Sequence, residues 1–356
     1  MNVQVNHADS FAASPVRVAE DAVMIRTAAQ LSRDLIVARP AIYWADFLGS
    51  ATLGYAALAL AIVGHDWLQA IGFVVAVLAL YRAGSFIHEV SHLRPDAVPG
   101  FRTAFNLVVG VPLLVPSFMY EGVHSLHHAR TRYGTAEDPE YLPLARMTPW
   151  TLPVFTISAL LAPLALLLRY GIFAPLGLVV PPLRQLLVAR FSALSINPDF
   201  RRRSPEGDFA RHWLRWEAAA SLWAIALIAG AATGVLPWRG CAIALAVVSV
   251  TMLLNQVRTL VAHLWDNDGE VLTVTGQYLD SVNVPPPALL PMLWAPVGLR
   301  YHALHHLLPG VPYHALGEAH RRLKAAMPAE STIHGADYRG LPGLVVRLAR
   351  GARASG

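Results

Sequence analysis

The chain has 356 residues, of which 55% are hydrophobic and only 14% are charged. This composition is that of an integral membrane protein rather than a soluble one. The net charge of +5 comes almost wholly from arginine, because Lys324 is the only lysine. No nucleic-acid motif accompanies the arginines, so membrane lipids are their expected partners and nucleic acid is not. The single cysteine, Cys241, excludes a disulfide or a C-x-x-C metal site within the chain.

The N-terminal region, residues 1–40, is expected to hold a tail and an interfacial helix. Residues 1–20 have the character of a disordered segment and lack the apolar core of a signal peptide. Apolar residues then recur at helical spacing between charged ones: Val23, Met24, Ala28, Leu31, Leu35 and Ile36. This pattern predicts an amphipathic helix that lies on the membrane surface.

Four apolar stretches approach the roughly 20 residues that a helix needs to cross ~30 Å of hydrocarbon. They form two pairs, 47–64 with 67–87 and 218–236 with 240–262. The very short connectors predict two helical hairpins, whose turns lie on the same side of the membrane if the segment between the hairpins does not cross it. We therefore expect an all-α integral membrane fold with four transmembrane helices in two hairpins, interfacial helices and a cytoplasmic helical cap. The membrane domain is predicted to span residues 41–325.

Two further apolar stretches, 107–119 and 152–183, contain several prolines. They are predicted to be interfacial or re-entrant helices, with the alternative that one of them crosses the membrane. Most arginines, including the run at 201–203, lie on the side opposite to the hairpin turns, and the positive-inside rule makes that side cytoplasmic. Both termini are expected there, in a multi-pass protein of the bacterial cytoplasmic membrane. Residues 326–356 are predicted to form a cytoplasmic tail with a frayed basic end, VRLARGARASG.

Three short clusters contain eight of the 15 histidines. HEVSH contributes His88 and His92, HSLHH contributes His124, His127 and His128, and HALHH contributes His302, His305 and His306. Residues three or four positions apart share a helix face, so each cluster can direct at least two imidazoles at a common point. A mononuclear zinc site uses about three protein ligands, and eight histidines are too many for it. Two metal ions would use them all, and imidazole suits iron, zinc and copper.

Other functions are compatible with parts of this pattern. HEVSH alone is also the H-E-x-x-H signature of zinc hydrolases, in which Glu89 would be the general base. That alternative predicts that the other two clusters are dispensable. A transporter or a metal-binding protein without catalysis would need polar residues near the middle of the spanning helices, and the sequence has few. Three clusters beside the cytoplasmic ends of membrane segments favour a two-metal centre.

The three clusters resemble, in order and spacing, the histidine boxes of the membrane fatty acid desaturase family, over roughly residues 40–325. The resemblance implies a di-iron centre held by these eight histidines, with O₂ as co-substrate. It also implies that His263, in RTLVAHLW, is a ninth ligand. In some acyl-CoA desaturases an asparagine four residues before that histidine holds an iron through water, whereas this chain has Thr259 there. The ligand shell of the second iron therefore differs from that pattern.

Acidic residues near the clusters can orient imidazoles by accepting their N–H groups. The candidates are Glu89, Asp138, Glu140, Asp266, Asp268 and Asp280. For each of them a role as a helix cap or turn residue is an equally good interpretation.

The resemblance favours desaturation of a long-chain fatty acyl substrate, which CoA, acyl carrier protein or a lipid can carry. Two electrons would come from a separate donor, a ferredoxin, rubredoxin or cytochrome with its reductase, because the chain has no electron-transfer module of its own. Hydroxylases and ketolases share the histidine boxes, so hydroxylation of a lipid or hydrocarbon chain is the alternative.

Overall fold

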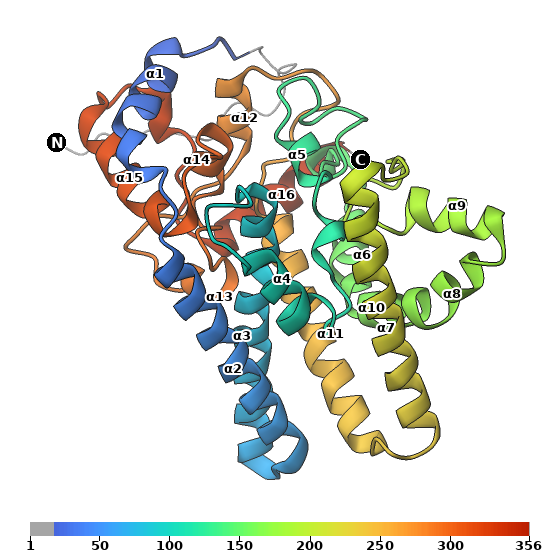
Figure 1. Ribbon diagram of the computed structural model, residues 1–356. Helices are drawn as coiled ribbons and strands as arrows, with labels where there is room; N and C mark the ends of the chain where they lie inside the picture. Colours follow the sequence, from blue (N-terminus) through green and yellow to red (C-terminus); the bar gives the residue numbers. More distant parts are fainter. Residues whose placement is uncertain (1–17, 356) are drawn as a thin grey trace.

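The computed structural model describes residues 18–355, and the regular elements of this part of the chain are helices (Figure 1). Four long helices form two antiparallel hairpins: α2 (Pro40–Val63) with α3 (Asp66–His92), and α10 (Gly207–Ala232) with α11 (Trp238–Leu260). The predicted all-α fold with two hairpins is confirmed. The helices α2, α3 and α10 are longer than the apolar stretches that predict them, and α3 therefore carries HEVSH in its own last turns.

The two hairpins meet at their turns. Arg239, in the first turn of α11, donates hydrogen bonds to the carbonyl oxygens of Ile62 and Gly64, the latter at 2.9 Å. Within the first hairpin, Gly72 allows α3 to pack closely on α2, because a Cβ atom there would lie 2.6 Å from the backbone nitrogen of Ala61. Both turns thus lie at one end of the molecule, as predicted.

Five helical segments among residues 18–355 are long and apolar enough to cross a membrane, one more than the four expected, and the chain is an integral membrane protein. The additional segment, Thr151–Gly177, falls within the stretch that the sequence predicts to be interfacial or re-entrant, and we call it the 151–177 segment. It consists of α6 (Thr151–Ile157), η5 (Ser158–Leu161), α7 (Ala162–Leu168), η6 (Arg169–Phe173) and α8 (Ala174–Gly177). Pro163 and Pro175 lie in the first turns of α7 and α8, so the helix changes pitch before each of them without ending. Its first half packs along α11.

The remaining elements are short, and most of them form a cap at the end opposite to the hairpin turns (Figure 1). They are α1 (Ala22–Leu31), η1 (Arg33–Leu35), α4 (Phe101–Phe105), η2 (Asn106–Gly110), η3 (Ser117–Met119), α5 (His124–His127), η4 (Leu144–Arg146), α9 (Pro181–Arg190), α12 (Val274–Asp280), α13 (Pro291–Trp294), α14 (His302–Leu307), α15 (Tyr313–Ala326), η7 (Thr332–His334) and α16 (Leu341–Ser355). α1 and α16, the first and last helices, both lie on the cap side (Figure 1).

The stretch 107–119 forms a compact turn between η2 and η3. The side-chain amide of Asn106 donates to the hydroxyl of Ser117 at 2.9 Å, and the backbone N–H of Ser117 donates to Asn106 Oδ1 at 2.8 Å. These bonds satisfy polar groups that the turn buries. Because its two ends meet, the stretch reverses direction and does not cross the membrane, as its prolines predict.

The amphipathic helix predicted near the N-terminus is α1, but its surroundings differ from the prediction. Met24 and Ala28 are fully buried in a cluster with Leu316 and Ala319 of α15. Part of the apolar face is thus covered by protein, while Val23 and Ile36 remain 60% and 57% exposed. The disorder predicted for residues 1–20 falls mostly outside the described residues, which begin at 18.

The frayed C-terminal tail predicted from VRLARGARASG is wrong, because residues 341–355 form the helix α16. Leu344, Leu348 and Ala352 recur every four residues and are buried against the cap. The numerous arginines and glycines conceal this spacing in the sequence, yet arginine is a good helix former. α16 is anchored through one apolar stripe next to η4.

Replacing Leu348 with alanine should destabilise the cap. Its side chain is only 5% exposed, so the substitution leaves a cavity that costs roughly 2–5 kcal/mol. Val346→Ala is the matched control, because Val346 is 48% exposed on the other face of α16. Thermal unfolding in detergent should show a lower midpoint for Leu348→Ala alone, and equal midpoints would contradict the packing of α16.

Candidate metal centre

All nine histidines predicted from the sequence converge in the structure. They form two groups, within each of which the candidate ligand nitrogens lie within 4.8 Å of one another. The group of five contains His88, His92, His124, His128 and His305, and the group of four contains His127, His263, His302 and His306. The rings of His128 and His306, one from each group, stack with centroids 4.3 Å apart. The two groups therefore adjoin and form one centre.

Helical spacing explains how the clusters divide. His124 and His128 are four residues apart and enter the same group, as do His302 and His306. His127 and His305, each three residues after the start of its cluster, enter the other group. On a helix, i+3 and i+4 lie on opposite sides of i, at about −60° and +40°, so the two imidazoles that follow the first one can diverge. Each H-x-x-H-H cluster thus serves both groups.

The imidazole nitrogens face one another at short distances. Nε2 of His305 lies 3.0 Å from Nε2 of His92, and Nε2 of His302 lies 3.0 Å from Nε2 of His263. Both nitrogens of His88, as well as Nδ1 of His306, are buried without a hydrogen-bond partner. Buried polar atoms without partners are costly. A shared cation in each group would satisfy lone pairs that point at a common centre, so the residues fit two metal ions.

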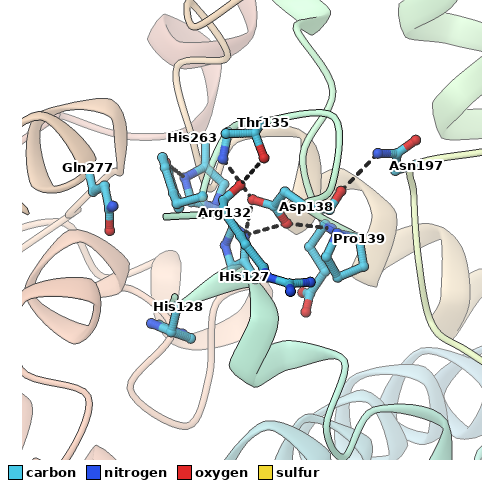
Figure 2. Close-up of polar contacts among 12 residues, drawn as sticks. His127, His128, Arg132, Thr135, Asp138, Pro139, Asn197, His263 and Gln277 are labelled. Carbon is cyan, nitrogen blue, oxygen red and sulfur yellow. Dashed lines mark hydrogen bonds and ion pairs between the residues drawn. The ribbon is translucent and has the colours of Figure 1, made fainter. Parts of the chain in front are cut away.

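Carboxylates contact the Nδ1 atoms of two imidazoles, on the side of each ring away from the metal site. Asp138 Oδ2 lies 2.9 Å from Nδ1 of His127, and Glu140 Oε1 lies 2.8 Å from Nδ1 of His124. Figure 2 shows His127 directed at Asp138, with Asn197 donating to the backbone oxygen of Asp138 on the far side at 2.9 Å. A carboxylate at Nδ1 places the proton there, so Nε2 presents its lone pair to the metal site.

A chain of two hydrogen bonds through Tyr133 connects His263 to Asp280. The hydroxyl of Tyr133 donates to Asp280 Oδ2 at 2.7 Å and accepts from Nδ1 of His263 at 2.8 Å. The hydroxyl of Ser281 lies 3.1 Å from the same nitrogen. His263 follows the end of α11 and pairs with Ser281 through a backbone bridge, which fixes its ring in the second group. It is therefore part of the centre and not an isolated interfacial histidine.

Burial largely determines the protonation states of the histidines and carboxylates in the centre. It lowers the pKa well below the ordinary value for six of the histidines: His124, His128, His263, His302, His305 and His306. These imidazoles are neutral and keep a lone pair for a metal. For His127, burial alone would lower the pKa, but the adjacent Asp138 outweighs it and the pKa is raised. Burial raises the pKa of Glu140 to about 7 and that of Asp280 to about 6.

The acidic candidates divide into two sets. Asp138, Glu140 and Asp280 orient histidines, directly or through Tyr133, as one interpretation of the sequence predicts. Asp266 and Asp268 instead form surface ion pairs, with Arg347 at 3.6 Å and Arg146 at 2.7 Å respectively. The positions of these acidic residues in the sequence do not show which of them orient histidines and which form surface ion pairs.

Glu89 is buried and has its own partners in the structure. Its Oε2 accepts from the hydroxyl of Tyr43 at 2.5 Å and from the backbone N–H of Tyr313 at 3.3 Å, while Oε1 lies 3.6 Å from Nδ1 of His88. A general base of a zinc hydrolase would need a free oxygen facing a metal-bound water. The engagement of Glu89 by Tyr43 does not favour that chemistry.

Sequence reasoning missed two tyrosines that support the centre. Tyr120 donates to Glu140 Oε2 at 2.7 Å, and its ring stacks on His124 with centroids 4.6 Å apart. Its position four residues before His124 is a signal that could have identified it. Tyr133 has no such signal, because its partners Asp280 and His263 are distant in sequence.

A cavity of about 370 Å³ reaches the centre. Its walls include His88 from the first group and His127, His263 and His302 from the second. The other walls come mainly from α3 and α11, with further residues from 193–196 and the 151–177 segment, and most are apolar. A cavity of this kind can hold a length of alkyl chain against both histidine groups while excluding water.

The fold and the centre together define a class, the integral membrane oxidoreductases with a histidine-rich two-metal site. The chain matches the family model described as "Fatty acid desaturase" over residues 65–336, and it belongs to this family. It is also 50% identical over 326 residues to a protein of Caulobacter vibrioides (strain NA1000 / CB15N) described as "Ceramide hydroxylase", an alignment that covers 91% of this chain and 93% of that protein. Comparison with solved structures gives no significant match.

Substituting Asp138 with asparagine should weaken the group of four histidines. The variant keeps the side-chain shape but removes the charge that fixes the Nδ1 proton of His127, and loss of such a partner typically costs 10–100-fold in metal affinity, roughly. Glu137→Gln is the control, since the Glu137 side chain is 71% exposed one residue earlier. Metal-to-protein ratios measured during titration with a chelator should fall earlier for Asp138→Asn. Identical titrations for the two variants would contradict the orienting role of Asp138.

Proposed function

We propose that this protein is a membrane-bound di-iron hydroxylase that acts on ceramide or a closely similar lipid. The observation that carries the proposal is the arrangement of five and four buried histidines in a chain that is 50% identical, over nearly its whole length, to a ceramide hydroxylase. The resemblance of the histidine boxes to those of the desaturase family favours desaturation. The comparison favours the alternative, hydroxylation of a lipid chain.

The group of five histidines would hold one iron and the group of four the other. His263 supplies the fourth imidazole of the second group, as the resemblance implies. The hydroxyl of Thr259 donates to the carbonyl oxygen of Asn255 at 3.0 Å. Iron is preferred over zinc because zinc has no redox chemistry, whereas the family consists of oxidoreductases.

When bound, the two irons supply the redox chemistry that activates O₂ and attacks an unactivated C–H bond. The overall reaction converts R–H, O₂, two electrons and two protons into R–OH and water. A separate donor must provide the electrons, a ferredoxin, rubredoxin or cytochrome with its reductase. The chain itself holds the ligands in place through Asp138, Glu140 and Tyr133, and its apolar cavity positions the lipid chain and excludes water.

Desaturation is the second candidate, because the family model is that of fatty acid desaturases. Both reactions begin by removing hydrogen from a methylene, so the same centre serves either. A desaturase then takes a second hydrogen from the adjacent carbon, whereas a hydroxylase returns oxygen to the first. The products are an alkene and an alcohol, which mass spectrometry separates.

The centre is proposed to face the cytoplasm. The positive-inside rule assigns the arginine-rich cap to that side, and α1 and α16 both lie there (Figure 1). Arginines on this face would steer an acidic electron donor towards the centre.

His128→Ala should abolish the reaction and release metal, because His128 lies in the group of five and stacks on His306 of the other group. His65→Ala is the control, since His65 is exposed in the turn between α2 and α3. The measurements are iron content of the purified protein and lipid profiling of a ceramide-producing host. The wild type and the control should produce hydroxylated ceramide with about two irons per chain. Normal product from His128→Ala, or zinc in place of iron, would refute the proposal.

A further inference from the structure

Arg258 occupies an unusual place beside the centre. It lies near the end of α11, and its guanidinium NH2 is 3.1 Å from Nδ1 of His302. The same side chain lines the 370 Å³ cavity, together with Tyr120 and Glu140. Arg258 thus lies next to a histidine of the group of four, in the wall of the space proposed for the lipid.

The contact between Arg258 and His302 differs from the other contacts made by Nδ1 atoms of the centre. His124 and His127 each face a carboxylate, and His263 faces the hydroxyl of Tyr133, so these nitrogens meet hydrogen-bond acceptors. A guanidinium has five N–H donors and no acceptor. Nδ1 of His302 can accept from Arg258 only if it carries no proton.

A metal bound to Nε2 of His302 would change which ring nitrogen carries the proton. Nε2 of His302 lies 3.0 Å from Nε2 of His263 and 3.2 Å from Nε2 of His306, which directs it into the group of four. If Nε2 binds a metal, a neutral His302 must carry its proton on Nδ1, and two donors cannot form a hydrogen bond. In the metal-loaded protein the N–H groups of Arg258 are therefore free to turn into the cavity that they line.

Arg258 forms no ion pair with a carboxylate among residues 18–355, although Glu140 lines the same cavity. Several other arginines of the structure do form such pairs. Arg169 and Arg184, for example, both pair with Glu217, at 2.7 and 2.6 Å. A cation at the wall of a mostly apolar cavity needs an acceptor to offset its lost hydration. The missing acceptor is most simply supplied by the molecule that fills the cavity.

We propose that Arg258 binds an oxygen of the polar linkage of the lipid, and that this contact selects the carbon that reacts. The inference rests on the proposed function, because ceramide carries an amide carbonyl and hydroxyl oxygens at the start of its chains. Since Arg258 also touches His302, a linkage held there places the reacting carbon within a few bonds of it. Carbons far along the tail would lie beyond the centre. Asn255, Gln256 and Thr259 add further polar groups to the same wall of the cavity.

The test compares Arg258→Gln and Arg258→Lys with the wild type and with Arg130→Gln, a control at an exposed ion pair with Glu20. Each purified protein is assayed with ceramide in nanodiscs for iron content, KM, kcat and the position of the new hydroxyl by tandem mass spectrometry. A hydrogen bond to a charged group is worth about 1.5–3 kcal/mol, so Arg258→Gln should raise KM roughly tenfold or more while retaining iron. Its product should also spread to neighbouring carbons, and Arg258→Lys should restore part of the affinity.

The outcomes separate the two proposals. If the wild type forms no hydroxylated ceramide, the proposed function fails and the role of Arg258 fails with it. If the wild type hydroxylates ceramide far from the linkage, the inference alone is overturned. It is also overturned if Arg258→Gln leaves KM and the hydroxyl position unchanged. Loss of iron from Arg258→Gln would assign the residue to support of His302 and overturn its role in lipid binding.

Discussion

The structure depends on the burial of nine imidazoles against one another. Most of them are neutral because burial lowers their pKa, and pairs of Nε2 atoms such as those of His92 and His305 face each other at 3.0 Å. Nitrogens buried in this way lose water and gain no protein partner, as both ring nitrogens of His88 show. Two shared cations remove that penalty, so metal binding and the stability of the cap are coupled. The cap without metal would concentrate unsatisfied polar atoms at one place.

The need to hold nine buried imidazoles together explains why the long helices and the loops of the cap have different roles. The hairpins supply rigid walls, and α3 presents His88 and His92 directly from a spanning helix. The loops of the cap supply Asp138 and Glu140, whose carboxylates contact Nδ1 atoms of imidazoles on the side away from the metal site. Asp138 does so from a turn in which the backbone N–H groups of Gly134 and Glu140 hold its two oxygens, at 2.9 and 2.8 Å. A carboxylate fixed on both oxygens can impose one ring orientation on His127.

The sequence predicted those features that are encoded by local spacing. The two hairpins follow from apolar length, and the i, i+3 and i+4 spacing of the histidines indicates that each cluster directs several imidazoles at a common point. How HSLHH divides between the two groups is seen only in the structure. Features that depend on distant partners could not be predicted in this way. Tyr133 gains its role only when Asp280 and His263 meet it, and α16 is stable because η4 covers its apolar stripe. The 151–177 segment is more continuously helical than its prolines suggest, because they fall in first turns, where a helix tolerates them.

The histidines alone cannot decide between an alcohol and an alkene as product, because both reactions use the same centre. The decision depends on which carbons the cavity holds near the centre and for how long, and the cavity is built mainly by α3 and α11. Its polar residues are concentrated on the last turns of α11, next to His263 and His302. A lipid anchored at that end has its nearest methylenes fixed most tightly and its tail least tightly. The position of the first carbon to react, and the distance of its neighbour from the centre, therefore both depend on how that end of the chain is held.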